Sequence, residues 1–328
     1  MIDISAHQIS TWADRVANRP EFPRLIRRLI LSETDEIQHA EMPAGDGVQL
    51  PGFDGLVEAT GGDPWVPAGL SAWELGTNNN PSSKANDDYG RRSANPGSID
   101  PSAATFVFVT PRTWANKGDW VQRKRAEGIW ADVRVYDAQS LEAWLEYREA
   151  VALWFADRLG LAFSGAVAVD VFWREAAQAT NPELSPSLLF NGRSSEVSAL
   201  HGWLESDESL LQISSESPRE SALFFASALA TASEESVRAW LSRAVVVTQE
   251  EGWRRLIASP LPLLVLLRSG DSAAVGQLVR RGHRVVVPTH PHGGSNRHVM
   301  ELPRLNREQF RAALQQMGFS EAEAGAKA

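Results

Sequence analysis

The pattern of apolar and polar positions divides the chain into two blocks of strand and helix signals. Short apolar runs bounded by Gly, Pro and polar residues predict strands, and apolar positions that recur every three or four residues predict helices. In the first block the strand signals cover residues 55–60, 70–75, 106–112 and 132–138. The helix signals cover residues 84–92, 114–127, 140–147 and 150–161. A connection rich in Gly and Pro joins the first two strands, so we expect them to form a hairpin-like pair.

The second block alternates strand and helix signals more regularly. Its strand signals cover residues 210–213, 244–248, 261–267 and 284–287, and its helix signals cover residues 218–232, 250–258 and 272–281. Such alternation predicts a parallel sheet with helices on its faces. With 328 residues, 43% of them apolar, the chain is long enough for two cores. We therefore predict a first domain at residues 1–165, a linker at 166–182 and a second domain at 183–328.

Two carboxylates and a lysine follow one another in the first block in the order that metal-dependent phosphodiester hydrolysis needs. Asp54 lies in a Pro-Gly-Phe-Asp-Gly turn, Glu74 lies in an apolar run, and Lys84 follows a polar loop. A phosphodiester repels hydroxide, so a divalent cation held by hard oxygen ligands must neutralise charge and polarise a water. An ammonium group beside that water can orient it and stabilise the pentavalent phosphate. We predict that Asp54 and Glu74 hold Mg²⁺ or Mn²⁺ and that Lys84 activates the water.

This part of the chain resembles the PD-(D/E)XK restriction-endonuclease-like superfamily, especially its Mrr-like branch. In that superfamily a helix with a glutamate precedes a Gly-x-Asp-Gly turn, a strand that ends in Glu-x-Lys, and a further helix. The resemblance spans roughly residues 15–150, about one domain. It implies a mixed sheet flanked by helices, metal binding by Asp54 and Glu74, and a supporting role for Glu21 in the metal shell.

Position 76 departs from the superfamily's pattern, because Gly76 stands where the pattern has its lysine. The resemblance therefore implies that the catalytic lysine has moved to Lys84 on the next helix. Each assignment has a structural alternative. An aspartate between Phe53 and Gly55 is also typical of a turn. A lysine at position 84 is also typical of the solvent-exposed side of a helix. A carboxylate in the apolar run around Glu74 would otherwise be a costly half-buried charge.

Basic and acidic residues are segregated along the chain, although its net charge is −9. Residues 84–125 contain eight basic and four acidic residues, whereas residues 205–251 contain three basic and nine acidic ones. A local basic face is what contacts to backbone phosphates require. We predict DNA binding by Arg91, Arg92, Arg112, Lys117, Arg123 and Lys124. The alternative is that these cations form ordinary solvated helix faces.

The second block resembles the P-loop ATPase modules of STAND or AAA type that follow effector domains. Residues 191–204 resemble the segment that leads into such a module, and residues 211–229 occupy the place of the phosphate-binding loop and its helix. A working loop needs G-x-x-x-x-G-K-[ST], because glycine amides wrap the phosphates and lysine neutralises them. Residues 214–221 contain neither Gly nor Lys, and Arg268 and Ser269 stand where an active ATPase has its metal-binding acid. We predict a degenerate Rossmann-like or P-loop-like domain without a functional ATP site.

Cysteine is absent from the sequence, which excludes disulfides and thiolate metal sites. The sequence shows neither an 18-residue apolar run nor a leader, so we expect a cytoplasmic protein without a membrane partner. A nuclease followed by an NTPase-like domain implies, by analogy, a role in prokaryotic defence against phages or plasmids. Cleavage of both strands predicts a homo-oligomer, and the weakly capped helical signal at 306–319 predicts further domains or partner proteins.

Two other functions remain open at the level of sequence. A catalytically impaired nuclease fold would only bind nucleic acid or a partner, and Gly76 favours that reading. In a pure interaction protein both domains would be scaffolds, and the two acids would be exposed and far apart.

Overall fold

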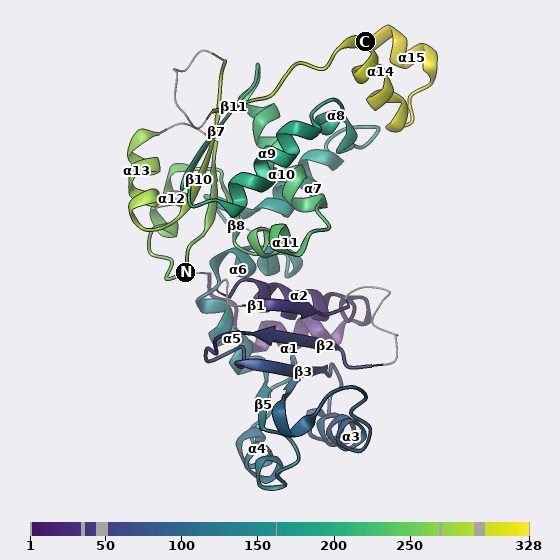
Figure 1. Cartoon of the computed structure of the whole chain (residues 1–328), viewed down its shortest axis with the longest axis vertical. Helices are drawn as coiled ribbons and strands as arrows, with labels where there is room; N and C mark the ends of the chain where they lie inside the picture. Colours follow the sequence, from purple (N-terminus) through teal and green to yellow (C-terminus); the bar gives the residue numbers. More distant parts are fainter. Residues whose placement is uncertain are drawn as a thin grey trace. The chain divides into compact units, whose positions relative to one another are not determined.

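A computed structural model describes residues 2–33, 37–43, 52–161, 163–268, 271–291 and 299–327 of the chain. Internal contacts divide the protein into two compact units, Met1–Phe155 and Ala156–Ala328 (Figure 1). Both units are α/β, as the sequence predicts. The segment 166–182, expected to be a linker, contains strand β6 (Ala166–Ala168) and helix α7 (Val169–Gln178). Both elements belong to the second unit, because β6 pairs with a strand of its sheet and Trp173 packs into its core.

A mixed five-strand sheet forms the centre of the first unit, in the order β1-β2-β3-β4-β5. Its strands are β1 (Ile37–Glu41), β2 (Gly55–Ala59), β3 (Gly69–Leu75), β4 (Thr105–Val109) and β5 (Asp132–Tyr136). The first three strands are antiparallel neighbours, and β3, β4 and β5 run parallel. The predicted hairpin-like pair is confirmed as β2 and β3. Strand β1 was not foreseen, because its sequence Ile-Gln-His-Ala-Glu has no apolar run and only Ala40 is buried.

Helices cover both faces of this sheet. They are α1 (Ala6–Asp14), α2 (Glu21–Leu31), α3 (Pro81–Ala94), α4 (Lys117–Ala126), α5 (Ala138–Glu146) and α6 (Glu149–Arg158), with short 3-10 turns at Val16–Asn18 and Pro101–Ala103. On one face Trp73 and Tyr136 pack near Trp144 of α5. On the other face Phe106 and its neighbours pack against Tyr89 of α3 and the rest of a core that includes α4. Glu74 alternates with Trp73 along β3 and so belongs to the face that α3 covers.

A mostly parallel six-strand sheet forms the centre of the second unit, in the order β11-β7-β10-β9-β8-β6. The additional strands are β7 (Leu210–Ser214), β8 (Ala244–Val247), β9 (Leu264–Leu267), β10 (Arg284–Thr289) and β11 (Val299–Glu301). Only β6 is antiparallel to its neighbour. The predicted parallel sheet is confirmed for the four strands with an apolar signal. The two edge strands have three residues each, too short to show a period in the sequence.

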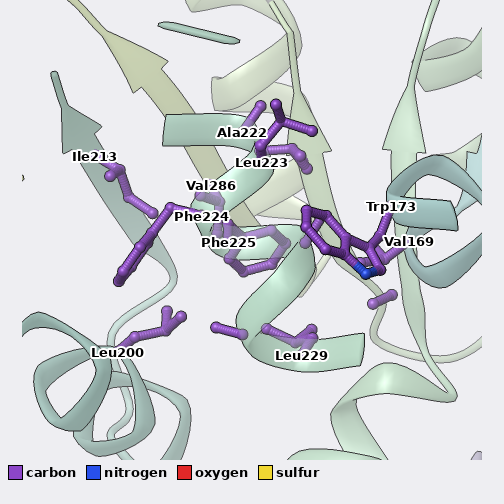
Figure 2. Packing of buried hydrophobic residues seen from close by; sticks show 14 of the residues in the cluster. Val169, Trp173, Leu200, Ile213, Ala222, Leu223, Phe224, Phe225, Leu229 and Val286 are labelled. Atoms are coloured by element: carbon purple, nitrogen blue, oxygen red, sulfur yellow. The ribbon is translucent and has the colours of Figure 1, made fainter. Parts of the chain in front are cut away.

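The helices of the second unit lie on both faces of its sheet. Besides α7 they are α8 (Ser187–Phe190), α9 (Ser194–Glu205), α10 (Pro218–Thr231), α11 (Glu235–Leu241), α12 (Glu250–Leu256), α13 (Ser272–Arg280), α14 (Arg307–Gln316) and α15 (Glu321–Lys327). In Figure 1, α12 and α13 lie on one face, and α7, α9 and α10 lie on the other. Helix α10 is buried over most of its length, and Figure 2 shows Phe224 and Phe225 in the core with Trp173 and Ile213.

Several predicted boundaries shift by a few residues. The strand expected at 106–112 ends at Val109, and the helix expected to begin at residue 114 begins at Lys117. Beyond the helical signal at 306–319, residues 321–327 form α15, and Glu323 accepts a hydrogen bond from the Ser320 backbone. Among the helices that the structure describes, none combines the length and apolar character needed to cross a bilayer.

Candidate functional site: two strand carboxylates and a helix lysine

The register between β2 and β3 brings Asp54 and Glu74 together. Gly55 pairs with Trp73, so one further step along the antiparallel pair sets Asp54 opposite Glu74. Side chains directly opposite one another in a sheet project from the same face. Asp54 Oδ2 also accepts a hydrogen bond from the backbone N–H of Leu75, with a nitrogen–oxygen distance of 2.7 Å. The two carboxylates that the sequence singled out therefore converge at the same end of the pair.

Glu74 is a buried carboxylate, with 1% of the residue exposed. The Arg92 side chain donates a hydrogen bond from Nε to Glu74 Oε1, and Arg91 Nη2 lies 3.6 Å from Glu74 Oε2. Burial and the nearby charge of Asp54 together raise the pKa of Glu74 to about 7, against the lowering effect of Arg92. Burial also raises the pKa of Asp54, against the opposing effects of the Leu75 N–H and the Lys84 charge.

Lys84 joins the carboxylates from helix α3, where Asn80 caps the N-terminus and Pro81 begins the first turn. Its ammonium group lies 2.7 Å from Asp88 Oδ1, one turn further along the same helix. A Cβ added to Gly76 would lie 2.8 Å from Lys84 Cγ and 2.7 Å from Phe108 Cζ. The Lys84 side chain therefore runs through the space that a side chain at position 76 would occupy.

Asp88 is a third buried carboxylate of the site, and it is not among the residues predicted from the sequence. The residue is 1% exposed, and its Oδ1 accepts hydrogen bonds from both Lys84 and Arg91. Its Oδ2 is buried and has no hydrogen-bond partner among the described residues. The negative charge of Asp88 contributes to the raised pKa values of Asp54 and Glu74. The Lys84–Asp88 spacing of four residues on a helix was the available signal.

Arg92 ties the turn before β2 to helix α3. Besides Glu74, its guanidinium contacts the carbonyl oxygen of Gly52 and lies over the Phe53 ring, 4.7 Å from the ring centroid. An arginine stacked on an aromatic ring and paired with a carboxylate holds both partners in a fixed geometry. The turn that contains Asp54 is therefore anchored to the helix that contains Lys84.

The carboxylates fit a divalent cation by the chemistry of their donors, because hard oxygens are the ligands that Mg²⁺ and Mn²⁺ prefer. In the part of the chain that the structure describes, no group of three or more His, Asp or Glu side chains is arranged to hold a metal ion. Asp54 and Glu74 are the two carboxylates of the predicted ligand set that converge. Among the described residues, the Oδ2 atom of Asp88 is a buried acceptor of the cluster that has no hydrogen-bond donor.

Glu21 occupies the first turn of α2, where it pairs with Arg24 at 2.6 Å. Its predicted support of the metal shell stays a prediction.

The six cations predicted to bind DNA differ in how they are held. Arg91 and Arg92 belong to the carboxylate cluster. Three others make internal contacts: Arg112 with Asp14 and with the carbonyls of Ser10 and Thr77, Lys117 with Asp137 and Ser140, and Lys124 with Glu127. Arg123 is exposed on α4. Arg91, whose side chain is 57% exposed although it pairs with Asp88, and Arg123 are the most accessible of the six.

The loop after β7 takes the position expected of a phosphate-binding loop, between a strand and the N-terminus of α10. The Ser215 hydroxyl bonds to the loop and to the helix that follows it: its Oγ lies 2.7 Å from the Ser217 carbonyl oxygen and 2.7 Å from Ser221 Oγ in α10. The loop keeps the strand-loop-helix geometry without the glycine amides or the lysine of a working loop.

Comparison with known proteins identifies no family. No protein-family model matches the chain, and a search of curated proteins finds no match. The fold and the geometry of the site are therefore the basis for any functional assignment.

Proposed function

We propose that the first unit is a metal-dependent DNA endonuclease with a restriction-endonuclease-like fold. The observation that supports it best is the space shared by Gly76 and Lys84: a Cβ at position 76 would lie 2.8 Å from Lys84 Cγ. Gly76 at the usual lysine position and Lys84 on the next helix therefore depend on each other, because the Lys84 side chain fills the space that a side chain at position 76 would occupy. Asp54 and Glu74 meet beside it, as phosphodiester hydrolysis requires.

Each group has a chemical role in this proposal. Asp54 and Glu74 would hold the divalent cation, which, when bound, supplies a Lewis acid for the phosphoryl oxygen. The Lys84 ammonium would orient the attacking water and stabilise charge that develops on the phosphate. Asp88 would hold Lys84 in place through its 2.7 Å ion pair, and Arg91 would contact the DNA backbone.

Plasmid cleavage tests the proposal. Supercoiled plasmid is incubated with the full chain and Mg²⁺ or Mn²⁺, beside Asp54→Ala, Glu74→Ala and Lys84→Ala, with Asp87→Ala on the exposed side of α3 as the matched control. We expect cleavage by the wild type and by the control, and loss in the three site variants by about 100-fold or more. Cleavage that persists in Lys84→Ala rejects the lysine assignment, and cleavage equal in all variants rejects the nuclease.

A positional swap sharpens the lysine assignment. In the Lys84→Ala background the lysine side chain no longer fills the space next to position 76. The side chain that Gly76→Lys introduces can then enter that space once the Phe108 ring shifts. We expect the double variant to recover part of the cleavage that Lys84→Ala loses. A double variant no more active than Lys84→Ala, but folded by circular dichroism, would contradict a shared position for the two lysines.

A second function, binding of nucleic acid or a partner without cleavage, is favoured by the ion pairs of the cluster. Asp54, Glu74 and Asp88 face three cations, Lys84, Arg91 and Arg92, so the carboxylates already have positive neighbours. This alternative predicts DNA binding that needs no divalent cation, together with no cleavage. If the first unit is a nuclease, in contrast, we expect DNA cleavage that requires Mg²⁺ or Mn²⁺.

For the second unit we propose a degenerate P-loop-like module that scaffolds or regulates the nuclease, as in prokaryotic defence proteins of this arrangement. The strand-loop-helix geometry of β7 and α10 supports the fold, and the internally bonded Ser215 and Ser221 support the loss of hydrolysis. We expect no ATP turnover above background by the full chain with Mg²⁺. Turnover that is robust and persists after repurification would overturn this part of the proposal.

A further inference from the structure

A cavity of about 500 Å³ opens within the second unit, next to the loop that follows β7. Leucine side chains form much of its wall: Leu184, Leu188, Leu189, Leu223 and Leu302, joined by Phe310 of α14. A volume of several hundred Å³ with mostly apolar walls and a few polar groups is typical of sites for small organic molecules. The cavity is separate from the carboxylate cluster, which belongs entirely to the first unit.

The walls of this cavity are held in place by polar contacts behind them. The Asn191 side chain donates a hydrogen bond to the backbone oxygen of Gln309 at 2.7 Å. Arg193, of which 1% is exposed, donates from Nε and Nη2 to the backbone oxygen of Pro303 at 2.8 and 2.6 Å. Gly192 has a φ of +73° and sits so close to Gln309 that a Cβ would collide with its side chain. The turn after α8 and the segment that leads to α14 are therefore fixed against one another, so the cavity is preformed.

Two of the three arginines that line the cavity, among the residues that the structure describes, pair with carboxylates. Arg193 pairs with Glu220, and Arg304 pairs with Glu216. Arg219, the remaining arginine of the lining, is exposed in the first turn of α10. Helix α10 has 14 residues, and its N-cap Ser217 makes no side-chain capping bond. The N-terminus of α10 and Arg219 therefore both line the cavity, where their positive charge favours a single negative charge.

We propose that this cavity binds a small organic monoanion with an apolar body, its anionic group at Arg219 and the α10 N-terminus and its body against the leucines. A nucleoside triphosphate fits poorly, because the loop has no lysine to neutralise the phosphates and no glycine that would let its backbone wrap around a chain of them. The apolar lining instead matches an aromatic ring or an alkyl chain. The inference does not depend on nuclease activity.

The probe that tests this class is 1-anilinonaphthalene-8-sulfonate, an aromatic body with one anionic group. Calorimetric titration of the full chain should give one site per chain. Arg219→Gln should weaken binding about tenfold, since a charge-assisted contact is lost. The uncharged analogue N-phenyl-1-naphthylamine should bind the wild type and Arg219→Gln equally. Leu188→Trp, which fills the cavity, should abolish the binding of both probes.

Controls separate this site from non-specific dye binding. Arg255→Gln removes an exposed arginine of α12, on the other face of the sheet, and should leave both affinities unchanged. Circular dichroism and thermal melting establish that each variant is folded. The proposal is overturned if the dye does not bind, or if it binds at several weak sites that Leu188→Trp does not affect. It is also overturned if Arg219→Gln binds the dye as tightly as the wild type does. Displacement of the dye by Mg-ATP at a lower concentration than by decanoate would overturn it as well.

Discussion

Lys84 on α3 and Gly76 after β3 compete for one volume, because a Cβ on Gly76 would lie 2.8 Å from Lys84 Cγ. Gly76 is fixed from the other side as well, since its backbone N–H donates to the Val109 carbonyl oxygen at 2.9 Å. The glycine cannot move away to admit a side chain without losing a sheet hydrogen bond. The position of the lysine stem thus depends on the absence of a side chain on the strand.

Gly76→Ala should displace Lys84 and lower plasmid cleavage by at least about tenfold, because a displaced ammonium no longer meets the phosphate. The overpacked methyl group should also cost about 1–3 kcal/mol in the free energy of unfolding. Gly90→Ala is the matched control: it lies in α3, and a Cβ there meets nothing within 4 Å. The control should keep full cleavage activity, and its free energy of unfolding should rise by about 0.5–1 kcal/mol. Equal activity in both variants would contradict the shared volume.

Asp88→Asn should lower cleavage without removing a ligand of the metal, because Lys84 and Arg91 lose the carboxylate that positions them. A pH profile distinguishes this role from a general loss of stability. The Asp88 charge raises the pKa of Glu74, so its removal lowers that pKa, and the acidic limb of the cleavage profile should move to lower pH. Asp87→Asn, one residue earlier and exposed, should leave the profile in place. An unshifted profile in Asp88→Asn would exclude the electrostatic link.

Arg123 and Lys124 should contribute differently to DNA affinity, although they are neighbours on α4. Arg123 is exposed, whereas Lys124 pairs with Glu127 at 2.8 Å and lies 4.4 Å from the Tyr89 ring centroid. Arg123→Gln should weaken binding and reduce the slope of log affinity against log salt by about 1, and Lys124→Gln should change the slope less. The measurement is fluorescence anisotropy with a labelled duplex at several salt concentrations. The reverse ranking would place the DNA on another face.

Glu33 should make the stability of the first unit depend on pH. Trp144 Nε1 and Arg148 donate hydrogen bonds to this buried carboxylate, and burial raises its pKa from 4.5 to about 7. A raised pKa favours the protonated folded state, so the stabilisation is complete below about pH 4.5 and is lost as the pH rises through about 7. The free energy of unfolding of the wild type should therefore fall over that range.

The comparison with Glu33→Gln isolates this contribution, because glutamine does not titrate. Urea denaturation at a series of pH values should show a shallower fall in the variant, with a difference of up to about 3 kcal/mol across the range. Glu58→Gln, on the exposed side of β2, should follow the wild-type curve. Parallel curves for wild type and Glu33→Gln would show that burial does not raise the pKa of Glu33.

Much of the fold could be predicted from the sequence, because its buried strands are continuous apolar runs. Strands β4 and β8, for example, are buried at every position. The pairing of Asp54 with Glu74 was also within reach, since a short Gly- and Pro-rich connection favours antiparallel neighbours. The sequence could not predict the contact of Lys84 with Asp88 or the overlap of Lys84 with position 76, because both depend on how α3 packs on the sheet. Local sequence patterns contain no information on that packing, and they also missed the pairing that makes β6 part of the second sheet.

The proposed nuclease depends on one divalent cation that Asp54 and Glu74 bind together. Electron paramagnetic resonance of free Mn²⁺, titrated with the full chain at a pH above 7 so that Glu74 is ionised, measures this directly. We expect one bound ion per wild-type chain, and loss of that ion in both Asp54→Asn and Glu74→Gln. Mn²⁺ binding that survives either single substitution at the wild-type affinity, or no binding by the wild type, would contradict a shared cation.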